Sequence, residues 1–127
     1  HAVLMFPETA CPTGPVYRRF DDLRPDARVD EDRVRRLSAE PMQKDSPFND
    51  LAAAALDLHS ALQDDLDRIR PIVEQPIHIS GSGSTLFTLC DDQFHADLLA
   101  AAVFEKLQIP ATAVQTAPGI NLGEVDR

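Results

Sequence analysis

The sequence predicts an α+β protein in which one four-stranded antiparallel sheet carries its helices on one face. Three observations lead to this fold class. Short apolar stretches bounded by turn residues occur four times, as expected of strands. Two longer stretches have apolar residues at spacings of three and four, which is typical of amphipathic helices. Their order is that of a split β-α-β, or ferredoxin-like, layer.

Composition limits the classes of function. The 127 residues suit one domain, since 43% are hydrophobic and 26% charged. A net charge of −9 argues against nucleic-acid and membrane-surface binding, because phosphate groups are bound by clustered Lys and Arg. Cys11 and Cys90 suit free thiols in a cytoplasmic protein, although a bridge between them stays open. Because the chain begins with His1 inside an apolar run, we expect a fragment.

The first strand is expected at residues 2–6, a continuous apolar run that suits burial on both faces and stops at Pro7. A loop follows. Residues 16–23 should then form a short helix, with Thr13 as its cap and Pro15 near the first turn.

The stretch 24–46 is charged and interrupted by prolines, which makes it the hardest part to assign. One helix is expected at 30–39, where the carboxylate of Asp30 can accept hydrogen bonds from the first free N–H groups. Its apolar stripe consists only of Val34 and Leu37, so little burial is expected there.

The most sustained amphipathic pattern runs from Phe48 to Val73. Apolar residues recur there at spacings of three and four: Leu51, Ala55, Leu58, Leu62, Leu66, Ile69 and Val73. Pro71 should interrupt the last turn because its ring removes a backbone donor. We therefore expect either a break near Arg70 or two helices that meet around Asp64.

The second long helix is expected to start at Asp91 or Asp92, either of which can cap it, and to run to Gln108. The side chains expected on its apolar side are Phe94, Leu98, Ala101 and Ala102, with Leu99 and Val103 adjoining. Residues 109–116 then form the last strand.

A loop that alternates Ser and Gly joins two short strands expected at 77–79 and 86–89. It consists of Ser80, Gly81, Ser82, Gly83, Ser84 and Thr85. Glycine permits positive φ and close approach, and the N–H groups of such a loop can receive an anion. The dinucleotide fingerprint, the Walker loop and the nucleophile elbow all fail, for want of a third Gly, a Gly-Lys pair and a following helix respectively. A plain hairpin is the alternative interpretation.

The remaining titratable side chains form no ligand pattern. Three histidines share neither a helix nor a ligand spacing with a Cys or carboxylate trio: His59, His78 and His95. An acidic cluster is interpreted as a solvated face: Asp64, Asp65 and Asp67. No metal ligand is assigned.

Four motifs, in this order, resemble the C-terminal half of the GHMP kinases. They are the strand ending in Pro7, Pro-Thr-x-x-Val-Tyr-Arg-x-Phe-Asp at 12–21, Phe-Asn-Asp-Leu at 48–51, and Ile-Ser-Gly-Ser-Gly-Ser-Thr-Leu-Phe at 79–87. The segment 13–18 is most similar to family members that phosphorylate a cytidine-diphosphate-linked small molecule in non-mevalonate isoprenoid synthesis. The resemblance implies a C-terminal domain over residues 1–127 whose N-terminal, ATP-binding half is absent from this sequence.

By this resemblance, Tyr17 stacks on the cytosine, Arg18 lies beside the base and Thr13 lies near the substrate. The chemistry fits, since aromatic stacking is worth about 1–3 kcal/mol per base in nucleic-acid binders and Arg donates in a planar fork. The alternative is that Tyr17 packs in the core and Arg18 is solvated.

The resemblance also implies that the glycine loop supports a phosphate-binding loop of the N-terminal half and takes no part in catalysis. Asn49 and Asp50 match an Asn-Asp pair at a helix start, where a capping role suffices. The family's catalytic Asp and Lys lie in the N-terminal half, so no residue here is assigned to phosphoryl transfer. ATP and Mg²⁺ would be needed by the full-length enzyme, and the chain alone is expected to be inactive.

Two other functions stay open. The chain could belong to another GHMP small-molecule kinase, of the homoserine or mevalonate type, in which Tyr17 and Arg18 would be surface residues. It could instead be a non-catalytic ferredoxin-like binding module that uses the Gly/Ser loop only as a hairpin.

Overall fold

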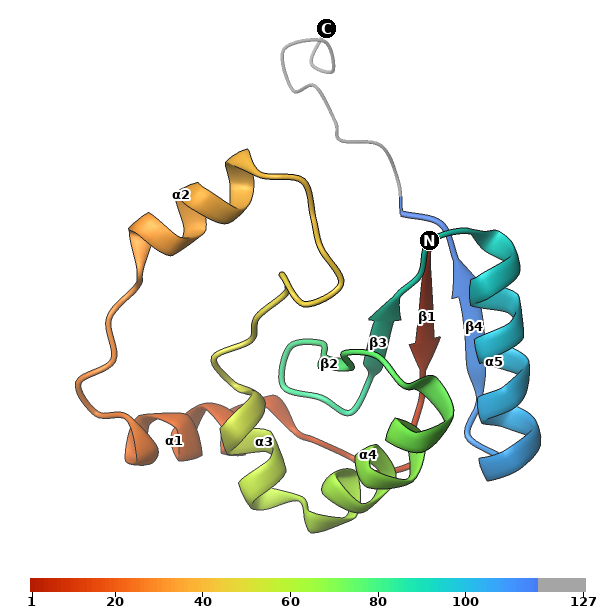
Figure 1. The fold of residues 1–127 in the computed structure, drawn as a ribbon. Helices are drawn as coiled ribbons and strands as arrows, with labels where there is room; N and C mark the ends of the chain where they lie inside the picture. Colours follow the sequence, from red (N-terminus) through yellow and green to blue (C-terminus); the bar gives the residue numbers. More distant parts are fainter. Residues whose placement is uncertain (117–127) are drawn as a thin grey trace, which may run out of the picture.

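The computed structural model describes residues 1–116, and its elements follow the predicted order (Figure 1). They are β1 (Ala2–Met5), α1 (Thr13–Leu23), α2 (Glu31–Ala39), α3 (Ala52–Leu58), α4 (Ser60–Val73), β2 (His78–Ile79), β3 (Leu86–Leu89), α5 (Gln93–Leu107) and β4 (Ala111–Val114). Asp30 and Asp92 cap α2 and α5 as expected, each accepting a backbone N–H three residues ahead.

The four strands form one sheet in the order β2-β3-β1-β4, with every neighbouring pair antiparallel. The most apolar strand, β1, is central, and its Leu4 lies opposite Phe87 on one side and Thr112 on the other. This strand order, together with the chain order, is the ferredoxin-like arrangement, so the predicted fold class is confirmed.

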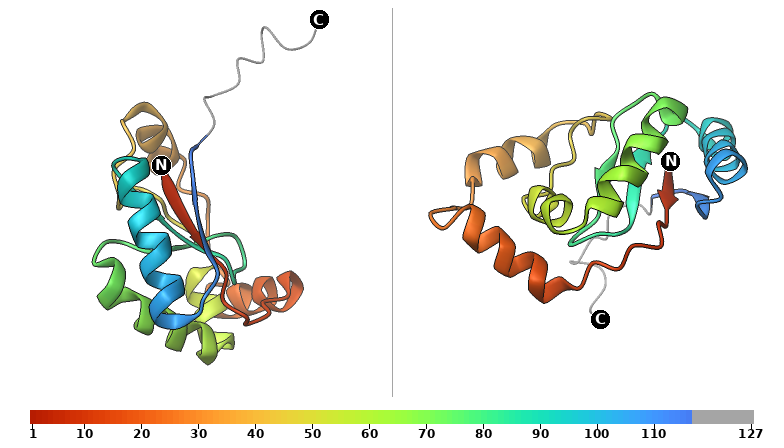
Figure 2. Two further views of the ribbon diagram at one scale, coloured as in Figure 1. Left: turned by 90° about the vertical axis from the view of Figure 1, so that its right-hand side faces the viewer. Right: turned by 90° about the horizontal axis from the view of Figure 1, so that it is seen from below.

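The core lies between the sheet and its helices. Val3, Met5 and Leu86 point to this side and are fully buried, together with Leu62 and Ile69 of α4. α5 packs against α4, β1 and β4. Leu4 faces the other side of the sheet and is only half-buried, so the expected burial of β1 on both faces is only partly met. Figure 2 shows α1 and α2 at one end of the molecule and α5 at the other.

The expected break near Arg70, or a junction around Asp64, is wrong. The two helices meet at His59, and α4 continues through Pro71 to Val73. The proline ring costs one backbone hydrogen bond close to the end of α4. Burial of residues on both sides of it, Ile69 and Val73, holds the last turn in place.

The start of α1 and the packed face of α5 also differ from expectation. Thr13 is the first helical residue of α1 and does not cap it, because Gly14 and Pro15 are both accommodated in the first turn, where a missing N–H costs nothing. In α5, Phe94 and Leu98 are mostly exposed, whereas Ala96 and Val103 are buried. Leu99 and Leu107 of the same helix also pack against the core, so the packed face is rotated away from Phe94 and Leu98.

Candidate functional site

The glycine loop is a tight hairpin that joins β2 to β3. The Ser80 amide donates to the Thr85 carbonyl at 2.9 Å, and the Gly83 amide donates to the Ser80 carbonyl at 3.0 Å. Gly81 and Gly83 adopt φ values of +57° and +89°, a region that residues with a Cβ rarely enter. The backbone path of this turn therefore accounts for the two glycines.

The hydroxyl groups of two loop residues, Ser82 and Ser84, point to the segment that connects β1 to α1. Ser82 Oγ donates to the Cys11 carbonyl at 3.3 Å, and Ser84 Oγ donates to the Pro7 carbonyl at 3.4 Å. Thr13 Oγ1 lies 3.4 Å from Ser82 Oγ. The structure thus brings the predicted residue Thr13 into contact with the predicted loop, across 69 positions of sequence.

Asn49 fixes the other side of the loop. Its Nδ2 group donates to the carbonyls of Ile79 and Gly81, at 2.8 and 2.6 Å, while its Oδ1 accepts from the Leu51 amide at 3.0 Å. The N-cap of α3 is Leu51, so Asn49 forms an Asx turn ahead of the helix and at the same time clamps the loop. Capping alone, the role expected from the sequence, does not account for these contacts.

Tyr17 lies on the surface and not in the core. Helix α1 docks through the buried Val16 and through an ion pair between Arg19 and Asp57 of α3. This leaves 52% of Tyr17 exposed. The expectation that Tyr17 is accessible to a ligand is therefore compatible with its position, and the alternative of a core tyrosine is not.

Tyr17 lines a pocket of about 490 Å³ that the glycine loop and the clamp also reach. Its walls come from α1, the turn after it, the start of α3 and the loop: Tyr17, Phe20, Arg24, Ala27, Arg28, Val29, Asn49, Asp50, Leu51 and Gly81. Arg18 is exposed and is not among these residues; one of its guanidinium nitrogens lies beside Gly14. The structure thus separates the three predicted substrate residues, with Thr13 at the loop, Tyr17 in this pocket and Arg18 outside it.

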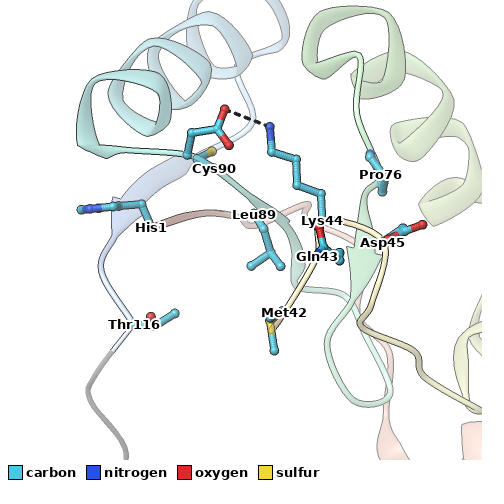
Figure 3. Close-up of a pocket in the computed structure, with 10 residues that line it drawn as sticks. His1, Met42, Gln43, Lys44, Asp45, Pro76, Leu89, Cys90 and Thr116 are labelled. Atoms are coloured by element: carbon cyan, nitrogen blue, oxygen red, sulfur yellow. Dashed lines mark hydrogen bonds and ion pairs between the residues drawn. The ribbon is translucent and has the colours of Figure 1, made fainter. Parts of the chain in front are cut away.

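A second pocket, of about 550 Å³, contains no residue that the sequence predicted (Figure 3). It lies where the segment around Lys44 passes Leu89 and Cys90, and Lys44 forms an ion pair with Asp91 at 3.1 Å.

Both cysteines, Cys11 and Cys90, are free thiols. Burial raises the pKa of the Cys90 thiol and of the Cys11 thiol, so both are poorly ionised at neutral pH.

Within residues 1–116, no three His, Cys, Asp or Glu side chains lie close enough together to hold a metal ion. The hydroxyls of Ser82 and Ser84 are directed to backbone carbonyls of the same chain. In the same part of the chain, no helix is long and apolar enough to cross a membrane.

Comparison with known proteins points to one kind of enzyme. No protein-family model matches the chain. Proteins of two Caulobacter vibrioides strains, NA1000 and ATCC 19089, both named 4-diphosphocytidyl-2-C-methyl-D-erythritol kinase, are 37% identical to it over 106 residues. The match covers 79% of this chain but only 37% and 36% of those proteins.

A solved structure gives the same result. The crystal structure of a 4-(cytidine 5'-diphospho)-2C-methyl-D-erythritol kinase matches with a TM-score of 0.63 and 27% identity, over 87% of this chain and 40% of that one. The chain therefore spans well under half the length of the proteins that it matches. Both matches support the resemblance that the motifs at 12–21, 48–51 and 79–87 suggested, and the chain is related to the GHMP kinases.

Proposed function

We propose that this chain is the C-terminal, substrate-side domain of an ATP-dependent kinase that phosphorylates 4-diphosphocytidyl-2-C-methyl-D-erythritol in non-mevalonate isoprenoid synthesis. The kinases that it matches carry this name, and the shared region includes most of this chain. The observation that carries the proposal is the half-exposed ring of Tyr17 on the wall of a pocket that ends at Gly81.

Tyr17 supplies a flat apolar surface on which the cytosine of the substrate stacks. Its helix is held in place from two sides, by the ion pair to α3 and by the contact between Thr13 and Ser82. The glycine loop therefore affects substrate binding indirectly, because it holds the segment that leads into α1. This contact fixes the position of Thr13 relative to Tyr17. Arg18 is placed to contact the base only if the substrate extends beyond the pocket.

Phosphoryl transfer belongs to the N-terminal kinase half, which we propose as the partner of this domain. ATP would supply the phosphoryl group and Mg²⁺ would accompany ATP in the full-length enzyme, and we assign no step through either group to the residues of this chain. The role of this chain is to bind and orient the acceptor substrate. We expect such a kinase to work in the cytoplasm, and the chain alone to transfer no phosphoryl group.

Calorimetric titration of the chain with 4-diphosphocytidyl-2-C-methyl-D-erythritol tests the proposal. Tyr17→Ala should weaken binding by about tenfold, because it removes a stacking surface worth about 1–3 kcal/mol. Tyr17→Phe keeps the ring and should bind like the wild type. Equal affinity of Tyr17→Ala and the wild type would contradict the cytidine assignment and favour another GHMP kinase substrate. If the chain alone transferred the phosphoryl group from ATP to the substrate, the assignment of that step to the N-terminal half would be contradicted.

A further inference from the structure

Two arginines that have no assigned role line the same pocket as Tyr17. Arg24 is the residue that follows the end of α1, Arg28 comes four residues later, and both line the pocket together with Tyr17. The guanidinium of Arg28 donates through Nη1 to the carbonyls of Asp26 and Ala27, at 3.2 and 3.1 Å. These bonds orient the group and leave its other donors for a ligand.

Within residues 1–116, neither arginine forms an ion pair. Five other basic side chains in the same range do: Arg19, Arg35, Lys44, Arg68 and Arg70. The other four Lys and Arg side chains of this range also form none, and Arg24 and Arg28 differ from them in lining one pocket together in a chain with a net charge of −9. The pocket also contains one carboxylate, Asp50, so its own side chains carry a net charge of about +1.

We infer that Arg24 and Arg28 bind the diphosphate group of a cytidine nucleotide whose base stacks on Tyr17. In this inference, the identity of the base rests on the proposed function. The binding of the diphosphate rests on the two arginines alone. Guanidinium groups bind phosphate oxygens through paired, charge-assisted hydrogen bonds, which gives both affinity and a fixed orientation. Asp50 repels the diphosphate from its side of the pocket and can accept hydrogen bonds from the ribose hydroxyls.

The chain reports on this pocket without a label. It has one tyrosine, Tyr17, and no tryptophan, so its intrinsic fluorescence comes from the proposed stacking residue. Titration with cytidine and with cytidine diphosphate should quench this fluorescence, and the diphosphate should bind about tenfold more tightly. Arg24→Gln and Arg28→Gln should each reduce that ratio, and the double variant should bring it close to one while the affinity for cytidine stays unchanged.

Arg36→Gln is the matched control, because Arg36 is an exposed arginine of α2 that forms no ion pair among residues 1–116 and lies outside the pocket. It removes the same charge and should leave the ratio unchanged. A ratio that persists in the double variant, an equal loss in Arg36→Gln, or no quenching by either ligand would overturn the inference. If adenosine diphosphate binds as tightly as cytidine diphosphate and shows the same dependence on both arginines, the anion site stands and the cytidine assignment fails.

Discussion

Two regions of the molecule are stabilised in different ways. The sheet with α4 and α5 is held by apolar side chains, several of them fully buried. The arm, residues 24–50 including α2, contains no buried residue and is held by a few polar contacts. Three of them join it to the rest of the chain: Asn49 to the glycine loop, His78 Nε2 to the Lys44 carbonyl at 2.8 Å, and Lys44 to Asp91.

This difference places the candidate pocket at the boundary between a rigid and a loosely held part. Tyr17 and Gly81 belong to elements that pack on the core, whereas Arg24 and Arg28 belong to the arm. Apolar burial thus determines the stability of the fold, while exposed polar contacts determine how the arm is held against it. The following variants test this division, beginning with the largest expected effect.

Leu62→Ala should cause the largest loss of stability. Leu62 is fully buried in α4, and removing its side chain leaves a cavity that rigid neighbours cannot fill, so the free energy of unfolding should fall by about 3 kcal/mol. Urea denaturation followed by circular dichroism measures the change. The matched control is Leu98→Ala in α5, where 54% of the side chain is exposed and the loss should stay below about 1 kcal/mol. Equal losses in both variants would refute the division between core and surface.

Gly83→Ala should come next, at about 2 kcal/mol. Its φ of +89° is strained for any residue with a Cβ, and the added carbon would lie 3.2 Å from Cys11 Sγ and 3.3 Å from Leu62 Cδ2. Gly81→Ala is the control, because φ is +57° there but nothing lies within 4 Å of the added carbon. It should cost about 1 kcal/mol from the backbone alone. A loss in Gly81→Ala as large as that in Gly83→Ala would show that packing under the loop contributes nothing.

Asn49→Ala should cost about 1–2 kcal/mol, because it leaves the carbonyls of Ile79 and Gly81 without their donor. Asn49→Ser keeps an oxygen that can accept from the Leu51 amide but cannot clamp the loop. It should therefore recover only about 0.5 kcal/mol. Amide hydrogen exchange at Ser80 and Gly83 should increase in both variants. Full recovery in Asn49→Ser would mean that the turn before α3 is the whole role of Asn49.

The same division explains what the sequence could predict. The strands, α5 and its cap follow from local patterns and were predicted closely, as was the thin packing of α2. The junction at His59 was not predicted, and neither was the continuation of α4 through Pro71, where burial of Ile69 and Val73 overrides the local preference of proline. The clamp by Asn49 was missed because its acceptors lie about 30 residues away along the chain. The arginine pair was missed because Arg24 and Arg28 lie after the predicted helix, and only the fold brings them to the pocket of Tyr17.

Phe48→Ala should have the smallest effect on global stability. Phe48 is 41% exposed, and its ring lies 4.0 Å from the guanidinium carbon of Arg33 in α2, a contact worth about 0.5 kcal/mol at such a site. Because little else holds α2, its amides should exchange faster in Phe48→Ala while those of α4 and α5 keep their rates. Arg33→Gln should give the same pattern, and the double variant should add nothing further if the two side chains act only on each other. A loss of about 2 kcal/mol or more in global stability, or faster exchange in α4, would show that the arm is part of the cooperative core and that its arginines are positioned as rigidly as Tyr17.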